Sequence, residues 1–347
     1  MKITNCPMQI TYLFRSPGTG YSIETVFGHI RQSMSLLHDV QTQDVQMPNI
    51  SHNLRQVWQN LRFVRRLHAD IFHITGDVHY AALALPASRT VLTIHDCGPL
   101  KKFRHRPFRY VAFWLLWYYL PVRRARYVTV VSEKTRQELI RYLGRIGEKA
   151  IVVPNGYDPS MVYTPARFKA ERPVLLQVGT ASNKNLLRLI NALYGIPCTL
   201  VIVGTLTDDI IAYLQTHQID YRHYVNLSRE ALIDCYINCD MVTFLSTYEG
   251  FGMPILEANA IGRVVLASAL EPLLSIAPGA AHFVDPTDTI AIRQGVLRLM
   301  DDEYYRNRLI EAGLDTVRRY SIDKATEHYA AIYQKAFRNT PLAEVVA

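Results

Sequence analysis

Two carboxylates frame the most chemically promising stretch of the sequence, STYEGFGMPILEANA at residues 246–260. Glu249 precedes a Gly-Phe-Gly turn, and Glu257 follows Pro254 in a helix-compatible run. Because proline suits the first turn of a helix, a helix N-terminus with free backbone N–H groups should face a ligand here. Such an end attracts phosphate, the two glycines let the backbone come close, and carboxylates pair well with vicinal hydroxyls. The spacing therefore predicts one elongated ligand that carries phosphate and hydroxyl groups.

Lys184 is the second candidate, in the segment VGTASNKN between a predicted strand and a predicted helix. It follows Gly179 by five residues. An ammonium group in such a loop neutralises the negative charge that develops on a leaving phosphate. The simpler alternative is an ordinary surface lysine.

A glycine pair in the N-terminal half, Gly18 and Gly20, follows the predicted strand QITYLF. This is where a Rossmann-like sheet meets its ligand. A dinucleotide fingerprint needs a third glycine where Ile23 stands, and an acidic residue about 20 positions further on. Only Asp39 and Asp44, in polar sequence, are available there. The pattern therefore disfavours a dehydrogenase.

Three histidines lie at or after predicted strands of the N-terminal half. His95 ends the strand TVLTIH, while His73 and His79 share the segment HITGDVHY with Asp77. The histidines come from two loops without a recognisable ligand spacing, and no D-x-D triplet occurs in the chain. We therefore expect no metal site.

The elements that must position these residues alternate between strand-like and helical runs. The first half contains QITYLF, IFHITG, TVLTIH and RYVTVVS, and the second contains PVLLQVGT, CTLVIVGT, MVTFLST and RVVLAS. Strands that alternate with helical segments indicate parallel sheets. The sequence thus predicts an α/β protein with two Rossmann-like domains.

The boundary between the two domains is predicted within VVPNGYDPSMVYTPARFKAERP, because its four prolines and its Asn-Gly turn break regular structure. The expected domains are residues 1–165 and 166–347, with parallel sheets facing an interdomain crevice. The last segment, SIDKATEHYAAIYQKAF, has helical spacing, and this C-terminal helix is a candidate to pack back on the N-terminal domain.

Positive charge is concentrated in one segment. The chain carries a net charge of +8, and residues 101–150 hold 13 basic against 3 acidic residues. Within it, the apolar run YVAFWLLWYYL at 110–120 is about half a membrane span. A helix that is apolar all round is usually core, but tryptophan and tyrosine with basic flanks also suit a helix on anionic lipid. No nucleic-acid-binding motif accompanies the charge, so we expect peripheral membrane contact through residues 101–126 and no nucleic acid.

Composition excludes several classes of protein. With 49% hydrophobic and 20% charged residues, the chain is neither disordered nor fibrous. Five scattered cysteines outline no disulfide framework, and the start MKITNCPMQITYLF resembles a strand rather than a signal peptide. We therefore expect a cytoplasmic protein.

The E-x7-E spacing inside EGFGMPILEA resembles the donor-site motif of the family-4 retaining glycosyltransferases, which have the GT-B architecture of two Rossmann-like domains. The resemblance extends along almost the whole chain. It includes, in family order, VLTIHD, VTVVSEKTRQEL, IVVPNGYDP, VLLQVGTASNKNL, LVIVGT and ALIDCYINCDMVTFLSTYEGFG.

By this resemblance, Glu249 contacts donor-sugar hydroxyls close to the reacting carbon, and Glu257 contacts the ribose. Lys184 stabilises the leaving phosphate. The remaining donor-binding residues implied by the family are Gly18, Gly20, Gly179, Thr180, Asn183, Gly250, Phe251, Gly252, Met253 and Pro254, and the last five form a diphosphate-facing backbone.

In the N-terminal half the resemblance implies that His95 lies beside the transferring sugar, where a donor group of the ring bonds a sugar hydroxyl or orients the acceptor. The family usually adds an arginine near the lysine, but Thr180 or Asn183 occupies that place. Arg15 is a candidate replacement. Further candidate phosphate or acceptor contacts are His73, Asp77 and His79.

The implied function is a metal-independent, cofactor-free, retaining glycosyltransferase that moves a hexose-type sugar from a nucleotide-diphosphate sugar to a glycan or lipid-linked acceptor. Envelope polysaccharide assembly, of the O-antigen or capsule kind, is the expected setting, at the inner face of the cytoplasmic membrane. Two alternatives remain open: a non-catalytic binding module that keeps the fold, and a retaining phosphorylase in which inorganic phosphate replaces the nucleotide. Acceptor-dependent release of nucleoside diphosphate separates the three.

Overall fold

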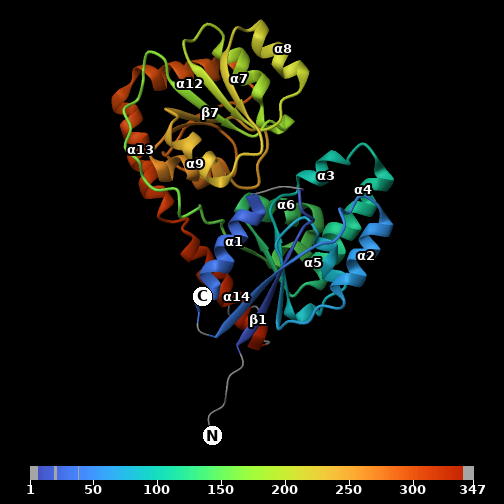
Figure 1. The fold of residues 1–347 in the computed structure, drawn as a ribbon. Coiled ribbons are helices and arrows are strands. Elements are labelled where there is room, and N and C mark those ends of the chain that lie inside the picture. The colour runs from blue at the N-terminus through green and yellow to red at the C-terminus, as the bar shows by residue number, and fades with distance from the viewer. Residues whose placement is uncertain (1–6, 19–21, 38, 339–347) are drawn as a thin grey trace. The chain divides into compact units, whose positions relative to one another are not determined.

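The computed structural model divides the chain into two compact units (Figure 1). Unit 1 comprises Met1–Gly156 together with Ile322–Ala347, and unit 2 comprises Tyr157–Ser321. The residues that the structure describes are 7–18, 22–37 and 39–338.

The first division lies at 156/157 rather than at 165/166, because residues 157–165 group with unit 2, where Thr164 N donates to Ile261 O at 3.1 Å. The C-terminal helix, named as a candidate to pack on the N-terminal domain, belongs to unit 1. A Cβ added to Gly156 would lie 2.7 Å from the Cα of Ile322, so the two backbone segments touch and leave no room for a side chain. On the other side of the division, Tyr157 N donates to Tyr320 O at 2.9 Å. The chain therefore passes between the units twice, along adjacent segments.

Unit 1 is built on a six-stranded parallel sheet in the order β2-β1-β3-β4-β5-β6. Its strands are β1 (Met8–Phe14), β2 (Val40–Gln46), β3 (Ile71–Ile74), β4 (Thr90–Ile94), β5 (Tyr127–Val130) and β6 (Ala150–Val152). The central strands β3, β4 and β5 are buried throughout, whereas the edge strand β2 is largely exposed. Strands buried on both faces are nearly continuous apolar runs, as the sequence shows.

Helices cover both faces of this sheet. They are α1 (Ser22–Ser35), α2 (Leu54–Val64), η1 (His79–Leu83), η2 (Ala87–Arg89), α3 (Gly98–Lys102), α4 (Pro107–Phe113), η3 (Trp114–Tyr119), α5 (Leu120–Arg124), α6 (Glu133–Leu143), η4 (Gly144–Lys149) and α14 (Ile322–Arg338). The last helix packs against α1 with Ala325, Tyr329, Ile332 and Tyr333 buried, as their helical spacing predicts.

Unit 2 repeats the architecture in the order β12-β11-β10-β7-β8-β9, again all parallel. Its strands are β7 (Val174–Val178), β8 (Thr199–Val203), β9 (Asp220–Tyr224), β10 (Met241–Phe244), β11 (Val264–Ser268) and β12 (His282–Val284). Its helices are η5 (Ser182–Lys184), α7 (Leu186–Leu193), α8 (Asp208–Thr216), α9 (Arg229–Ile237), α10 (Met253–Ile261), α11 (Leu273–Ile276), α12 (Thr289–Asp301) and α13 (Glu303–Val317).

The aromatic segment 110–120 is not one regular helix. It begins in α4, passes through the π-helical turns of η3 and enters α5. Tyr118 is buried, and Phe113, Trp114 and Trp117 pack against the core of unit 1. Most of the aromatic side chains of this segment therefore pack, partly buried, against the core. In the described part of the chain, no helix combines the length and the apolarity that a bilayer span requires.

Candidate active site

Lys184 and Glu249 meet in unit 2, although 65 positions separate them in the sequence. Lys184 lies in the loop after β7, and Glu249 in the loop after β10. These strands are neighbours at the point where the strand order reverses, and ligands of doubly wound sheets bind outside the carboxyl ends of such strands. The Lys184 Nζ lies 2.6 Å from Glu249 Oε1, with side-chain exposures of 20% and 15%. The structure thus places both groups in one partly open site.

Three neighbours hold the lysine. Its aliphatic stem crosses Gly179, where an added Cβ would lie 3.2 Å from Lys184 Cε, and Gly179 has a φ of +91° that favours glycine. Its ammonium lies 4.7 Å from the centroid of the Phe244 ring, a cation–π distance. The Gln177 side chain donates to Lys184 O at 3.2 Å. The lysine is therefore positioned before any ligand binds.

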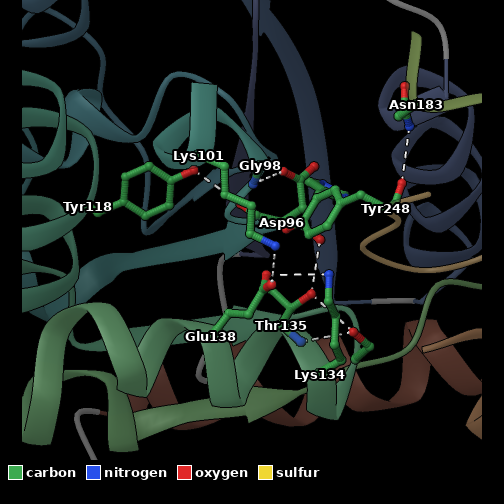
Figure 2. A network of polar contacts seen from close by, with 11 residues as sticks. Asp96, Gly98, Lys101, Tyr118, Lys134, Thr135, Glu138, Asn183 and Tyr248 are labelled. Carbon is green, nitrogen blue, oxygen red and sulfur yellow. Dashed lines mark hydrogen bonds and ion pairs between the residues drawn. The ribbon is translucent and has the colours of Figure 1, made fainter. Parts of the chain in front are cut away.

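Thr180 and Asn183 organise the loops around the lysine. Asn183 Nδ2 donates to Tyr248 O at 3.1 Å (Figure 2), and Asn183 O accepts from Thr247 N at 2.8 Å. Thr180 Oγ1 donates to Thr205 O at 2.6 Å. These side chains, predicted as donor contacts, bond to backbone carbonyls of neighbouring loops. Their observed role is to join the loop after β7 to the loops after β8 and β10.

The start of α10 is where the sequence predicts an anion site. Within the described residues no side chain caps this end. Pro254 has no N–H and Ile255 N donates to Gly252 O at 3.0 Å, so the backbone N–H groups of Gly252 and Met253 are the ones that an anion could use here. Pro254 stands in the first turn, and Gly252 has no room for a side chain, because an added Cβ would lie 2.8 Å from Leu273 Cδ2. The Phe251 ring is buried against Tyr320, with centroids 5.9 Å apart. At Phe251, therefore, only the backbone can face a phosphate.

Glu257 is buried and already bound on both oxygens. Oε1 lies 2.9 Å from Arg229 Nη2, and Oε2 accepts from the Tyr236 hydroxyl at 2.7 Å. Arg229 Nε in turn donates to Asp158 Oδ2 at 2.6 Å. Burial lowers the pKa of Arg229, but the two carboxylates outweigh it and the pKa is raised. A hydroxyl contact at Glu257 would use a remaining lone pair of a carboxylate that this network orients.

Arg229, Asp158 and Tyr236 were not found from the sequence. The segment SREALIDCY indicates only a helix that starts at Ser228, and no spacing rule connects it with Glu257. Tyr236 and Glu257 meet because α9 packs on α10. This contact is tertiary and lies beyond sequence periodicity.

In unit 1, Arg15 is not a spare cation. Its Nε and Nη2 donate to the two oxygens of Glu24 at 2.8 Å and 2.9 Å, and its Nη1 donates to Asp77. Burial lowers the pKa of Arg15, but the two carboxylates raise it overall. Since both partners belong to unit 1, the structure gives no support to Arg15 as the replacement for the missing family arginine.

His95 follows β4 and is held by the loop after β3. Its Nε2 lies 2.7 Å from Thr75 O, and a Cβ added to Gly76 would lie 2.8 Å from its Cδ2. Burial lowers the pKa of His95, so the ring is neutral at pH 7. The single ring proton then points to the Thr75 carbonyl, and Nδ1 can only accept a hydrogen bond. A contact of His95 with a sugar hydroxyl or with the acceptor stays a prediction, and in this arrangement Nδ1 would be the acceptor in that contact.

His73 and His79 are interior residues rather than phosphate or acceptor contacts. His73 lies within bonding distance of two hydroxyls, with Nδ1 2.5 Å from that of Tyr333 and Nε2 2.7 Å from that of Thr93. His79 Nδ1 lies 2.9 Å from Trp117 O. Burial lowers the pKa of His73 to about 3 and that of His79 to about 4. Both are neutral polar groups of the core.

The remaining predicted positions of unit 1 are glycines of the loop after β1. Gly18 has a φ of +77°, which favours glycine, and Gly20 lies outside the described residues. Among the described residues, no group of three or more metal-binding side chains gathers in one place.

Asp96, beside His95 in TIHD, is a polar site that sequence reasoning passed over. Its Oδ1 accepts from Gly98 N at 2.6 Å, and its carbonyl accepts from the Tyr118 hydroxyl at 3.1 Å (Figure 2). Burial raises the pKa of Asp96. Figure 2 also shows Glu138 between Lys101, at 2.9 Å, and Lys134, at 3.4 Å. In the sequence, the signal that could have identified Asp96 is its position next to His95.

Known proteins resemble the chain along most of its length. The "Glycosyltransferase Family 4" model matches residues 29–161, and the "Glycosyl transferases group 1" model matches residues 165–316. The O-antigen chain mannosyltransferase B of Escherichia coli is 26% identical over 306 residues, which are 82% of this chain and 78% of that protein.

Solved structures share the fold at low identity. Sucrose-phosphate synthase from Thermosynechococcus elongatus has a TM-score of 0.78 at 17% identity, covering 96% of this chain and 100% of that one. Anabaena HepE in complex with UDP and glucose has a TM-score of 0.72 at 17% identity, covering 94% and 100%. Two parallel sheets, a site at the strand-order reversal of the second, and the two matching family models lead to one conclusion. The chain belongs to the family-4 glycosyltransferases and has the GT-B fold.

Proposed function

We propose that this glycosyltransferase moves a hexose-type sugar from a nucleotide-diphosphate sugar to a glycan or lipid-linked acceptor in envelope polysaccharide assembly. The observation that carries the proposal is the Lys184–Glu249 pair, 2.6 Å apart in the loops after β7 and β10. The functions of related proteins support it. The E. coli relative is an O-antigen chain mannosyltransferase, and the Anabaena structure holds UDP and glucose.

We assign the two members of the pair to different parts of one ligand. Diphosphate lies over the first turn of α10, where backbone N–H groups and the helix dipole attract it. The Lys184 ammonium turns from Glu249 toward the leaving phosphate, and the Glu249 carboxylate then accepts from sugar hydroxyls. Lysine and helix end thus take the place of a divalent cation, and we propose a reaction that needs no metal.

The proposed stereochemical course is retention. The bond between the sugar carbon and the phosphate oxygen breaks, the acceptor oxygen bonds to the same face of that carbon, and the acceptor proton passes to the leaving phosphate. No protein nucleophile is required. Comparison of the anomeric configuration of donor and product by NMR tests this directly.

A binding screen of nucleotide-diphosphate sugars tests the donor. Uridine and guanosine diphosphate sugars are titrated into the intact chain, because one screen identifies the base and the sugar together. We expect one donor to bind best and Lys184→Ala to weaken its binding, with Arg188→Ala, an exposed cation one turn away on α7, as the matched control. Failure of every donor to bind would contradict the proposal.

We further propose that the enzyme works at the inner face of the cytoplasmic membrane and contacts anionic lipid through residues 101–126. This segment contains eight basic and no acidic residues. Juxtaposed basic side chains are attracted to the negative surface potential of anionic lipid. Contact with lipid would bring the enzyme to a lipid-linked acceptor.

A further inference from the structure

A second helix of unit 1 exposes apolar side chains beside arginines. On α2, Leu54 is 73% exposed and Trp58 is 55% exposed. The Arg62 guanidinium lies 4.7 Å from the Trp58 ring centroid. Because these three residues are four positions apart, they form one stripe on the outer side of the helix. The inner side carries the buried residues Val57, Asn60 and Val64.

The charge of this stretch is of one sign. Residues 49–66 contain four arginines and no acidic residue, and all four side chains are exposed: Arg55, Arg62, Arg65 and Arg66. Only the segment 101–126 shows the same pattern more strongly. Two separate segments of unit 1 therefore combine exposed apolar groups with several basic residues and no acidic residue of their own.

Contacts through the interior connect α2 with α4. Asn60 Nδ2 donates to the Tyr80 hydroxyl at 2.7 Å, and the Tyr80 ring packs edge-on to Trp117 with centroids 4.9 Å apart. Trp117 stacks on Phe113, the last residue of α4, at 5.0 Å. In Figure 1, α2 and α4 flank the same side of unit 1. The two helices are thus held on one scaffold.

The exposed part of α4 resembles that of α2. Phe108 is 91% exposed and Val111 is 54% exposed, while Arg104, Arg106 and Arg109 around them are exposed as well. Aromatic and aliphatic tips among arginines suit the boundary between lipid headgroups and acyl chains. An acidic protein partner would explain the arginines but not the isolated apolar tips on two helices.

We propose that α2 and α4 together form a two-part docking surface for an anionic bilayer. Trp58 and Phe108 enter the headgroup region, and the arginines of both helices bind lipid phosphates. This inference rests on the proposed function only for the role of the surface, which is to bring the enzyme to a lipid-linked acceptor. Its binding to lipid is measured without donor or acceptor.

The test uses the full chain and vesicles of phosphatidylcholine, alone or mixed with phosphatidylglycerol. Arg55→Gln/Arg62→Gln should weaken binding to the mixed vesicles by about fivefold per arginine, with unchanged binding to neutral vesicles. The matched control is Arg167→Gln/Arg308→Gln, which removes two exposed arginines of unit 2 and should change binding less than about twofold.

Fluorescence of Trp58 gives an independent readout. Mixed vesicles should shift the emission of the chain to shorter wavelength, and Trp58→Phe should abolish that shift, because Trp114 and Trp117 are already packed against the core. The test substitutions lie on exposed positions, so circular dichroism should confirm an unchanged fold.

Three outcomes would overturn the proposal: equal binding of the α2 variant and the unit 2 control, equal binding of wild type to neutral vesicles, or a Trp58 emission that vesicles do not alter. If a single-stranded RNA oligomer displaces the vesicles and its binding falls equally in the α2 variant, the surface is a nucleic-acid site instead. The α2 variant should transfer sugar to a soluble acceptor at the wild-type rate. This measurement distinguishes failure of the docking proposal, which concerns lipid binding, from failure of the proposed function, which concerns transfer.

Discussion

At the scale of single residues, the groups that we propose bind the donor already pair with one another. Lys184 and Glu249 form an ion pair that is only partly exposed, so each charge neutralises the other. A ligand with phosphate at one end and hydroxyls at the other offers a new partner to both. Glu257, in contrast, keeps Arg229 and Tyr236 as fixed partners. The two carboxylates should therefore act differently.

Lys184→Ala should lower the rate of transfer by a factor of about 10² to 10³, the usual size for removal of one preorganised electrostatic group. Transfer rates measured with and without a chelator check the same claim. We expect the chelator to change little. Activity that a chelator abolishes and added divalent metal restores would contradict a metal-free reaction, whatever the effect of the substitution.

Glu249→Gln and Glu257→Gln should affect different steady-state constants. Glu249 lies where the reacting carbon becomes cationic in the proposed transition state, so loss of its charge should reduce kcat more than donor affinity. In the proposed arrangement Glu257 contacts the ribose, remote from the reacting carbon, so loss of its charge should raise the donor KM with kcat nearer normal.

The control for this pair is Glu230→Gln, an exposed carboxylate in the first turn of α9. It should change neither constant. If Glu257→Gln lowers kcat at saturating donor while Glu249→Gln only raises KM, the assignment along the ligand is reversed. If neither substitution changes kcat or the donor KM, the donor-binding site lies elsewhere.

At the scale of elements, α14 is joined to the sheet of unit 1 by a buried polar cluster. His73 on β3 contacts the Tyr333 hydroxyl of α14 and the Thr93 hydroxyl of β4. Thr93 is also 2.6 Å from the Thr129 hydroxyl and 3.2 Å from that of Tyr329. Buried hydroxyls and an imidazole that satisfy one another fix the position of the helix.

This cluster predicts acid sensitivity. Burial lowers the pKa of His73 from its ordinary value of 6.5 to about 3 in the folded protein. As the pH falls, this histidine therefore takes up a proton in the unfolded chain before it does so in the folded protein. Its contribution to stability is therefore complete above pH 6.5 and is lost as the pH falls toward 3, by at most about 1.4 kcal/mol per pH unit. Denaturant unfolding between pH 7 and about pH 5 measures this slope.

His73→Gln should reduce that slope, whatever its effect on stability at pH 7. His328→Gln, an exposed histidine of the same helix, should leave the slope unchanged. A wild-type stability that does not fall below pH 6.5 would show that burial does not hold His73 neutral.

Much of the framework was predictable, because it depends on local pattern. Apolar runs of strand length alternate with helical segments, and the E-x7-E motif lies across a strand end and a helix start. The interior histidines were not predictable as such. His73 lies in a strand and His95 directly after one, and the sequence does not show that α14 and Phe27 of α1 cover His73. The pairing of Arg15 with Glu24 and Asp77 likewise needs three separate elements to converge.

At the scale of the whole molecule, charge is unevenly distributed over the two units. Replacing Arg104, Arg106 and Arg109 of unit 1 by glutamine should weaken binding to anionic vesicles by about 1 kcal/mol per charge near the surface. Activity on a soluble acceptor analogue should change little, because these exposed side chains, on and before α4, are assigned no contact with the donor. Added salt should weaken binding of the wild type. Vesicle binding that is the same in variant and wild type at low ionic strength would leave the segment with a structural role alone.

The central claim is sugar transfer from a nucleotide-diphosphate sugar, and its most direct measurement is release of nucleoside diphosphate by the intact chain. The donor that binds best is incubated with chelator, with and without a membrane fraction that contains lipid-linked glycan. We predict release that requires the acceptor and falls about 10² to 10³-fold in Lys184→Ala. Donor binding without release would indicate a binding module, and formation of sugar 1-phosphate that requires inorganic phosphate would indicate a phosphorylase. Either result would contradict the account.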